Sequence, residues 1–277
     1  MDLYCVMGHP VAHSKSPWIH ARFAQLTGEP VAYERRLIPL DGFAEGVRAF
    51  RAEGGRGCNV TVPFKFQAPA LADHVSARGR QAGACNTLRF DADGVHADNT
   101  DGVGLVADLR DNAGAVLQGA TILLVGAGGA AAGVLGPLLQ ARPAALTIAN
   151  RSPDKARALV ASHAALAHDC GVALSACGLE EVPSALDIVI NGTAASLGGD
   201  GIPVPARVLR PGTLAVDMMY GPAAQPFLDW AAAHGAVGRD GLGMLVEQAA
   251  EAFAFWRGVR PPSAQVLREL RAELARP

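Results

Sequence analysis

Short apolar runs alternate with amphipathic helical segments along this chain of 277 residues. In the first hundred residues, the apolar runs predict strands at residues 3–7, 33–38, 58–62, 87–90 and 95–97. Helical spacing predicts helices at residues 16–28, 41–50 and 64–74. We expect Ser16 and Asp41 to act as N-caps, with Pro17 in the first turn of its helix. The segment Asp91-Ala92-Asp93-Gly94 predicts a hairpin turn.

The second half of the chain continues this alternation around more apolar segments. Strands are predicted at residues 121–125, 146–149, 172–175, 187–190 and 214–218. Helices are predicted at residues 101–113, from 153 onward behind an N-cap at Ser152, and at 226–234, 244–257 and 263–274. Because helices separate most strands, the pattern is typical of an α/β protein with largely parallel sheets.

Length and order together predict two domains. We expect residues 1–104 plus 242–277 to form an α/β domain with a mostly parallel sheet. Residues 105–241 are expected to form a Rossmann-like, doubly wound domain. In this interpretation, the helix at 101–113 bridges the domains and the last two helices return to the first domain.

A glycine-rich turn follows the strand at residues 121–125 and opens an apolar helix. In dinucleotide sites of this form, the first glycine permits a tight turn, and the second lets the backbone approach a pyrophosphate. The helix N-terminus adds free N–H groups and a partial positive charge. The turn therefore predicts cofactor binding by Gly126, Ala127, Gly128, Gly129 and Ala130. A glycine-rich turn without a ligand is the structural alternative.

The end of the next strand, at residues 150–152, bears on which dinucleotide is bound. NAD sites usually place a carboxylate there to hold the ribose 2′-hydroxyl, whereas this chain has Asn150, Arg151 and Ser152, with Lys155 one turn later. A guanidinium can bind a 2′-phosphate through two parallel hydrogen bonds. These residues favour NADP over NAD, although Arg151 taken alone could be an ordinary surface cation.

Composition restricts the classes of partner and location. Half of the residues are hydrophobic and the net charge is −2, so there is no electrostatic reason to expect nucleic acid or an acidic membrane surface. The apolar runs are too short to span a bilayer, and the N-terminus lacks the features of a signal peptide. Five scattered cysteines without zinc-ligand spacing fit a reduced cytoplasmic protein without a metal site.

Four polar clusters stand where strands or turns should end in the first half of the chain. They lie at residues 13–17, 59–65, 83–87 and 98–102. Together they supply hydroxyls, amides, one lysine and one aspartate, a set that suits a small, polyhydroxylated, anionic substrate. Each residue taken singly also has a structural explanation, such as a helix cap, a solvent-facing strand position or a surface lysine.

Taken together, these motifs resemble the shikimate dehydrogenase family over nearly the full chain. The likeness rests on Ser-x-Ser-Pro, Asn-Val-Thr-Val-Pro-Phe-Lys, Gly-Ala-x-Asn-Thr, Asp-Asn-Thr-Asp-Gly, Gly-Ala-Gly-Gly-Ala-Ala and Asn-Arg-Ser. It extends to residues 217–220 (Asp-Met-Met-Tyr) and 240–248 (Asp-Gly-Leu-Gly-Met-Leu-Val-Glu-Gln). The resemblance implies reversible reduction of 3-dehydroshikimate to shikimate with NADPH, a step toward chorismate and the aromatic amino acids.

The resemblance also implies individual roles. Lys65 and Asp101 would be the catalytic pair, flanking the oxygen that changes oxidation state. Substrate would contact both of them and Ser14, Ser16, Asn59, Thr61, Asn86, Tyr220 and Gln248. Met218 and Gly241 would lie near the nicotinamide, and Asn150, Arg151, Ser152 and Lys155 near the rest of the cofactor. No metal is implied, and the protein would act as a monomer or a homodimer.

Physical chemistry supports the proposed division of work between Lys65 and Asp101. Hydride transfer to a ketone builds negative charge on oxygen, which an ammonium group can stabilise and protonate. A neighbouring carboxylate would orient the lysine and favour its charged form. Three other functions stay open: a quinate-specific or NAD-using paralogue, a folate-linked dehydrogenase of similar topology, and a non-catalytic NADP-binding regulator.

Overall fold

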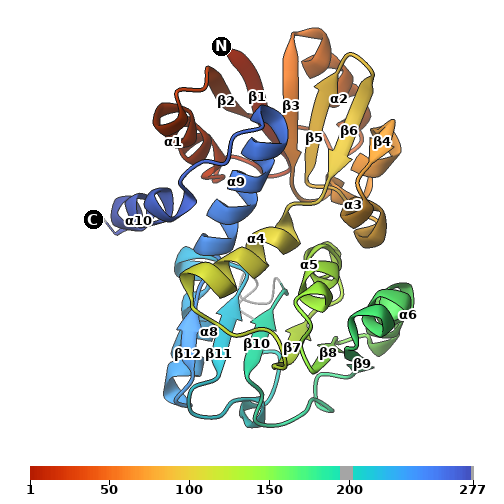
Figure 1. Ribbon diagram of the computed structural model, residues 1–277, viewed down its shortest axis with the longest axis vertical. Helices are drawn as coiled ribbons and strands as arrows, with labels where there is room; N and C mark the ends of the chain where they lie inside the picture. The colour runs from red at the N-terminus through yellow and green to blue at the C-terminus, as the bar shows by residue number, and fades with distance from the viewer. Residues whose placement is uncertain (194–201, 276–277) are drawn as a thin grey trace. The chain divides into compact units, whose positions relative to one another are not determined.

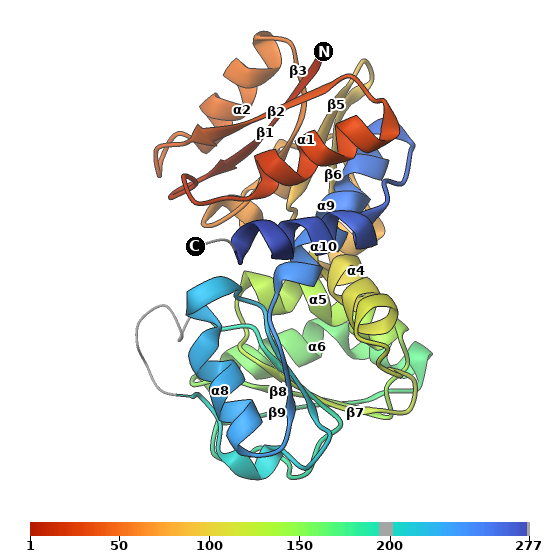
Figure 2. The same ribbon diagram turned by 90° about the vertical axis from the view of Figure 1, so that its left-hand side faces the viewer.

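The computed structural model describes residues 1–193 and 202–275 and divides into two compact units (Figures 1 and 2). Unit 1 comprises Met1–Gly104 and Leu245–Pro277, and unit 2 comprises Leu105–Met244. Two helices carry the chain from one unit into the other, α4 (Asp101–Ala107) and α9 (Leu242–Arg257). In the described part of the chain, no helix is both long enough and apolar enough to span a membrane.

Unit 1 is built on a sheet with the order β2-β1-β3-β5-β6-β4. Its strands are β1 (Asp2–Gly8), β2 (Val31–Leu37), β3 (Gly55–Val60), β4 (His74–Val75), β5 (Thr87–Asp91) and β6 (Gly94–Asp98). Its helices, besides parts of α4 and α9, are α1 (Ser16–Thr27), α2 (Phe43–Ala52), α3 (Ala77–Ala82) and α10 (Ser263–Leu274). The sheet is mostly parallel, as expected, but β5 runs antiparallel to β3 and to β6.

Alternation along β1 distributes the core of unit 1 over both faces of this sheet. Cys5 and Met7 point into a core that α2 completes with Phe43, Val47 and Phe50. Tyr4 points to the opposite face, where its ring stacks on Trp256 of α9 with centroids 4.6 Å apart. Both faces are therefore covered, which is the usual condition of sheets with parallel strands.

Unit 2 is a doubly wound sheet with the order β12-β11-β10-β7-β8-β9, and every strand pairing in it is parallel. The strands are β7 (Thr121–Val125), β8 (Ala145–Ala149), β9 (Ala173–Cys177), β10 (Ile188–Asn191), β11 (Leu214–Asp217) and β12 (Val237–Arg239). The helices are α5 (Gly129–Gln140), α6 (Pro153–Cys170) and α8 (Gln225–Ala233). The predicted Rossmann-like fold is thereby confirmed.

The two faces of the unit 2 sheet carry different helices. Ile122 and Leu124 of β7 pack in a core with α5, α6 and the end of α4. Leu123 and Val125 of the same strand pack with Phe227 of α8. Because both faces are buried, the strand is apolar at nearly every position and does not alternate.

Several local predictions were wrong. Neither Ser16 nor Asp41 caps a helix, because Lys15 and Gly42 hold those N-cap positions without a side-chain hydrogen bond. Ser152 does occupy its N-cap, but its side chain makes no capping bond. The expected helix at 64–74 is instead two 3₁₀ turns, Phe64–Phe66 and Ala68–Leu71, followed by β4. Pro69 within this segment cannot donate the hydrogen bond that an α-helix interior needs. The elements α3, β4 and β12 were missed because they are short.

His20 of α1 is fully buried among aromatic rings. Its ring stacks on the Tyr33 ring with centroids 4.3 Å apart, and its centroid lies 5.3 Å from that of the Trp256 ring. Burial lowers the pKa of His20 to about 3, because an imidazolium in this apolar place would lose its hydration.

This burial makes the stability of the protein depend on pH. Above the ordinary pKa, His20 is neutral in both the folded and the unfolded chain and has no effect. As pH falls below about 6.5, only the unfolded chain binds a proton here, so stability decreases until the folded pKa is reached. At about pH 5 the loss from this residue should be about 2 kcal/mol.

We expect His20→Phe to remove this part of the pH dependence. Chemical denaturation of the wild type and the variant at about pH 7.5 and about pH 5 measures it. His168→Phe, at an exposed position of α6, is the matched control and should keep the wild-type slope. An unchanged slope in His20→Phe would show that His20 takes up its proton in the folded protein.

Candidate active site

Strand register places three polar residues in one row at the edge of the unit 1 sheet. Asn59 near the end of β3 pairs with Thr87 at the start of β5, and Thr87 pairs with Asp98 at the end of β6. The antiparallel direction of β5 brings its first residue beside the last residues of its neighbours. The sequence clusters at 59–65, 83–87 and 98–102 therefore meet at this edge.

Lys65 and Asp101 form a direct ion pair within this group. Lys65 lies in the first 3₁₀ turn after β3, and Asp101 is the first residue of α4. The Lys65 Nζ donates to Asp101 Oδ2 over 2.6 Å, and the two side chains are 19% and 7% exposed. The amine stays accessible while the carboxylate is nearly enclosed, which suits a lysine that exchanges a proton with a small ligand.

The Asn86 amide connects this pair to α9. Its Nδ2 lies 2.8 Å from Asp101 Oδ1, 3.0 Å from Thr100 Oγ1 and 3.2 Å from Gln248 Oε1. Its Oδ1 accepts the backbone N–H of Thr100 over 2.8 Å. The predicted residues Asn86, Asp101 and Gln248 thus share one buried network, to which Thr100 belongs as well.

Gly104 allows α4 and α9 to approach closely at this point. A Cβ added at Gly104 would lie 2.5 Å from the Gln248 backbone nitrogen and 2.6 Å from its Cβ. Any side chain at this position would push Gln248 away from Asn86.

A second buried carboxylate, Asp98, holds the segment that leads to Asp101. It accepts hydrogen bonds from the Ser76 hydroxyl over 2.5 Å, from Arg78 Nε over 2.7 Å and from the Asn99 backbone over 2.8 Å. Arg78 also reaches Glu251 of α9 over 3.0 Å. Asp98 and Arg78 therefore fix the approach of β6 to the site, a role that sequence analysis did not assign to Arg78.

Asn59 is committed to contacts within the protein. The Tyr33 hydroxyl donates to its Oδ1 over 2.7 Å, and its Nδ2 donates to Thr87 Oγ1 over 3.0 Å. These bonds occupy its amide, so its evident work is to hold β3 against β5. Thr61, two residues later, is half-buried.

Ser14 and Ser16, the predicted contacts of the substrate carboxylate, lie close to each other at the start of α1 in unit 1. Their hydroxyls lie 3.1 Å apart, and Ser16 is buried whereas Ser14 is partly exposed. Arg35 of β2 donates two hydrogen bonds to the Ser14 carbonyl, over 3.0 and 2.6 Å. Arg35 thereby holds the loop that carries Ser14. The sequence did not predict this contact, because Arg35 belongs to none of the motifs.

In unit 2, the glycine turn has the conformation that the motif predicts. Gly126 has φ +109°, where side chains are disfavoured, and it approaches Gly192 and Thr193 beyond β10. The turn thus lies where β7 and β10 diverge, the switch point at which doubly wound sheets bind ligands. Gly128 precedes α5, with open space where a Cβ would stand, and Ala131 is fully buried against the sheet. These features fit a bound pyrophosphate.

The residues after β8 also fit an NADP site. Asn150 donates from its side chain to the Ser152 carbonyl over 2.9 Å and shapes this turn. Arg151 and Lys155 are both exposed, and neither forms an ion pair with another described residue. Two exposed cations beside this turn could attract the negative charge of a 2′-phosphate.

The remaining predicted residues follow β11 and β12. A Cβ at Gly241 would lie 2.3 Å from the Met218 carbonyl oxygen, so glycine is needed for this close approach. Tyr220 is half-buried, and burial raises the pKa of its hydroxyl. Met218, Tyr220 and Gly241 all belong to unit 2, whereas the two serines and the Lys65–Asp101 ion pair belong to unit 1.

Comparison with known families gives three matches in chain order. Residues 6–88 match the model described as shikimate dehydrogenase substrate binding domain. Residues 108–198 match shikimate/quinate 5-dehydrogenase, and residues 241–271 match the shikimate 5′-dehydrogenase C-terminal domain.

Individual relatives are similar over almost their whole length. A shikimate dehydrogenase (NADP⁺) of Acidovorax sp. strain JS42 is 65% identical over 274 residues, which cover 99% of this chain and 97% of the relative. Among solved structures, an Ael1 enzyme from Pseudomonas putida has a TM-score of 0.90 and 46% identity, covering 98% of each chain. The Thermus thermophilus shikimate 5-dehydrogenase in complex with NADP(H) and shikimate has a TM-score of 0.84 and 31% identity, covering 98% of this chain and 99% of that one.

The polar cluster of unit 1, the dinucleotide turn of unit 2 and these full-length similarities agree: the chain belongs to the shikimate dehydrogenase family.

Proposed function

We propose that this chain catalyses the reversible, NADPH-dependent reduction of 3-dehydroshikimate to shikimate. The observation that carries the proposal is the Lys65–Asp101 pair, held over 2.6 Å within a buried network of amide and hydroxyl groups. Family membership supports the same reaction. The substrate belongs in unit 1, whose segment at 6–88 matches a substrate-binding model, and the cofactor belongs at the glycine turn of unit 2.

When bound, NADPH supplies the hydride, and the protein supplies the proton and the electrostatic stabilisation. In this proposal, the Lys65 ammonium would hydrogen-bond the ketone oxygen, stabilise the negative charge that develops on it, and donate a proton to it. Asp101 would orient the Lys65 amine, to which it is hydrogen-bonded, and accept a hydrogen bond from a neighbouring ring hydroxyl. Partial exposure of Lys65 lets its amine recover a proton between turnovers.

The other polar residues of unit 1 suit the rest of the substrate. Thr61, Asn86 and Gln248 offer hydroxyl and amide groups to the ring hydroxyls. Ser14 and Ser16 offer two neutral donors to the carboxylate, and we include Tyr220 of unit 2 as a third. Asn59 acts by holding Asn86 and Thr87 in place, because its own amide is already bonded.

On the cofactor side, backbone N–H groups of residues 126–130 hold the pyrophosphate at the start of α5. Asn150, Arg151, Ser152 and Lys155 hold the adenosine end with its 2′-phosphate, and Met218 and Gly241 border the nicotinamide.

All five cysteines are free thiols, which supports a cytoplasmic location. Both catalytic side chains and their partners come from a single chain, so the site can form in a monomer or in each copy of a homodimer.

A steady-state spectrophotometric assay with shikimate and quinate, each with NADP and NAD, tests the proposed function. We expect clear turnover of shikimate with NADP, and slower reaction in the other three combinations. A paralogue acting on quinate is the second candidate, since one matched model covers both substrates. Turnover of quinate alone with NAD would replace the first assignment by that candidate.

Lys65→Met should lower kcat by about a hundredfold or more, the usual cost of losing a general acid. Asp101→Asn should also lower kcat. Because the two residues act as one unit, the double variant should be little worse than the slower single variant. Arg48→Met, which removes an exposed cation in the same unit, should keep normal turnover. Near-normal kcat in Lys65→Met would refute the catalytic assignment.

Replacing Arg151 and Lys155 by alanine should weaken NADP selectively. Loss of two contacts to a 2′-phosphate should raise the KM for NADP by about thirtyfold to nearly a thousandfold, at about 1–2 kcal/mol for each charged contact. The KM for NAD should hardly change. Arg157→Ala provides the matched control on the same helix, because Arg157 is already paired with Asp154. Equal effects on the two cofactors would contradict recognition of the 2′-phosphate.

A further inference from the structure

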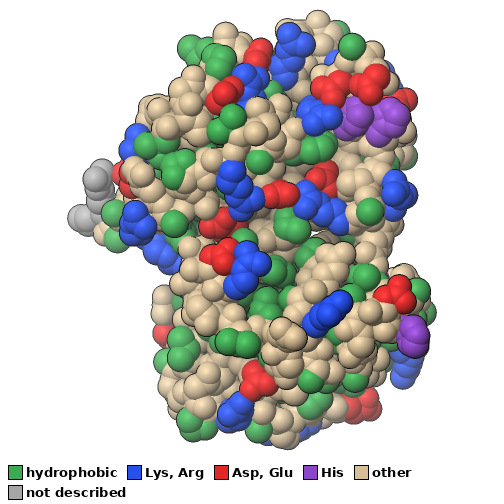
Figure 3. Space-filling model, in the orientation of Figure 1, with side chains coloured by type: hydrophobic (Ala, Val, Ile, Leu, Met, Phe, Trp, Pro, Cys, Tyr) green, Lys and Arg blue, Asp and Glu red, His purple; other side chains and the backbone are tan. Residues whose placement is uncertain are grey.

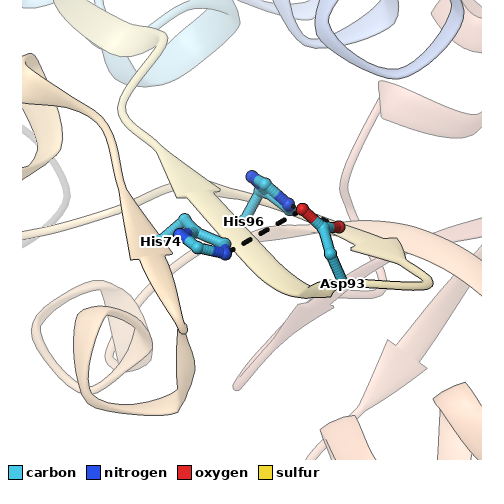
Figure 4. Close-up of side chains that lie close together, drawn as sticks. All are labelled: His74, Asp93 and His96. Atoms are coloured by element: carbon cyan, nitrogen blue, oxygen red, sulfur yellow. Dashed lines mark hydrogen bonds and ion pairs between the residues drawn. The ribbon is translucent and has the colours of Figure 1, made fainter.

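Two histidines and an aspartate lie together on unit 1 and take no part in the proposed reaction (Figure 4). His74 belongs to β4, His96 to β6, and Asp93 to the turn between β5 and β6. One coordinating atom from each residue lies within 4.8 Å of the other two. Figure 3 shows histidine side chains beside acidic ones on the upper right of the face that it draws.

The backbone places the two histidines opposite each other. His74 and His96 are direct partners in the parallel pairing of β4 with β6. Their rings stack with centroids 4.5 Å apart, and the Nε2 atom of each ring lies toward the Asp93 carboxylate (Figure 4). Backbone hydrogen bonds from Asp73 to Val95 and from Ser76 to Ala97, each 2.9 Å, fix this register.

The turn that carries Asp93 is anchored to the same strand. The Asp73 carboxylate accepts the Val95 backbone N–H over 2.8 Å. Gly94 has φ +137°, and a Cβ there would lie 2.5 Å from Asp73 Oδ2, so the turn needs glycine to reach this position. The position of Asp93 next to the histidines is therefore a consequence of the fold rather than of a flexible loop.

The distances suit a shared cation. Asp93 Oδ1 lies 3.1 Å from His96 Nε2, and Asp93 Oδ2 lies 4.0 Å from His74 Nε2. Ligand atoms about 2.0–2.1 Å from a tetrahedral zinc ion stand about 3.3 Å from one another. The His74 and Asp93 side chains are 55% and 68% exposed, so small rotations can bring all three atoms to this spacing.

We propose that His74, Asp93 and His96 bind a divalent transition-metal ion of the zinc type, with water in the open position. Imidazole nitrogens select zinc, cobalt, nickel or copper over magnesium and calcium, which prefer oxygen ligands alone. Asp91 adds a further negative charge beside the site, with its Oδ2 3.6 Å from His96 Nε2, while Arg89 Nε donates to the same oxygen over 2.7 Å.

Metal binding at this position would clamp β4 to the hairpin. β4 has only two residues and lies at the edge of its sheet, so few contacts of its own hold it. A ligand that binds only the folded form raises stability by mass action. The ion would thus stabilise unit 1 without entering the reaction, and the inference stands or falls independently of the proposed activity.

Titration of the chelator-treated full chain with Zn²⁺, followed by calorimetry and by thermal unfolding, tests the proposal. We expect one equivalent to bind and to raise Tm. His74→Asn, His96→Asn and Asp93→Asn should each weaken binding about tenfold or more, since even the outer partners of metal ligands typically contribute that much. His234→Asn, at an exposed histidine of unit 2, is the matched control and should bind as the wild type does.

Two further measurements keep the outcome decisive. Tm and shikimate turnover of each variant without metal should match the wild type, which shows that the variants fold. With Co²⁺ as the probe, the near-ultraviolet spectrum should lack a thiolate charge-transfer band, which excludes binding by the partly exposed Cys170 and Cys177. The proposal is overturned by absence of saturable binding up to millimolar Zn²⁺, by a thiolate band, or by unchanged binding in His74→Asn and His96→Asn.

Discussion

The arrangement of the site depends on the buried carboxylate of Asp101, because burying a carboxylate without hydrogen-bond partners is costly. Its side chain is 7% exposed, and its two oxygens are bonded separately, Oδ2 to Lys65 and Oδ1 to Asn86. Removal of one partner from a buried ion pair typically costs about 3–5 kcal/mol. Three chain segments far apart in sequence, after β3, before β5 and after β6, must therefore meet at this one side chain.

The sheet supplies the framework for that meeting. Because β5 is antiparallel to both neighbours, Asn59, Thr87 and Asp98 share one row, and the loops carrying Lys65, Asn86 and Asp101 extend from it. Asp98 is a second buried carboxylate with hydrogen-bonded partners. One of these partners, Arg78, also donates a hydrogen bond to Glu251 on α9. The helix that carries Gln248 is thus tied to the same edge by an ionic contact and by the Asn86 amide.

Sequence reasoning succeeded where a motif carries its own geometry. Gly126 and Gly128 predicted the dinucleotide turn because only glycine meets the demands of a positive φ and an open approach to phosphate. The family resemblance predicted that Lys65 and Asp101 act as a pair. Residue spacing alone also allowed Lys65 to be a surface lysine and Asp101 to be a helix cap. The cap predictions failed at Ser16 and Asp41 because each helix begins one residue away from the predicted position, with Lys15 and Gly42 as the N-cap residues.

Other features depend on long-range pairing that no local pattern contains. Arg35, Tyr33 and Arg78 contribute through partners 20 or more positions away, and nothing around them in the sequence marks these contacts. The same holds for His74, which meets His96 only because β4 pairs with β6 in one particular register. The helical spacing at 64–74 even favoured a helix that Pro69 does not allow.

The two binding regions prepare for their ligands in opposite ways. In unit 1, the carboxylate and amide groups around Lys65 are already paired with one another, so the substrate meets a fixed set of donors and acceptors whose ordering cost was met during folding. In unit 2, Arg151 and Lys155 remain exposed, so in the proposed function their ordering would accompany binding of the 2′-phosphate. A fixed site favours precise placement of the reacting carbon, where small displacements cost much of the rate. Exposed cations would suit the 2′-phosphate end of the cofactor instead. They can attract the phosphate and select NADP over NAD, and this end of the cofactor takes no part in the reaction.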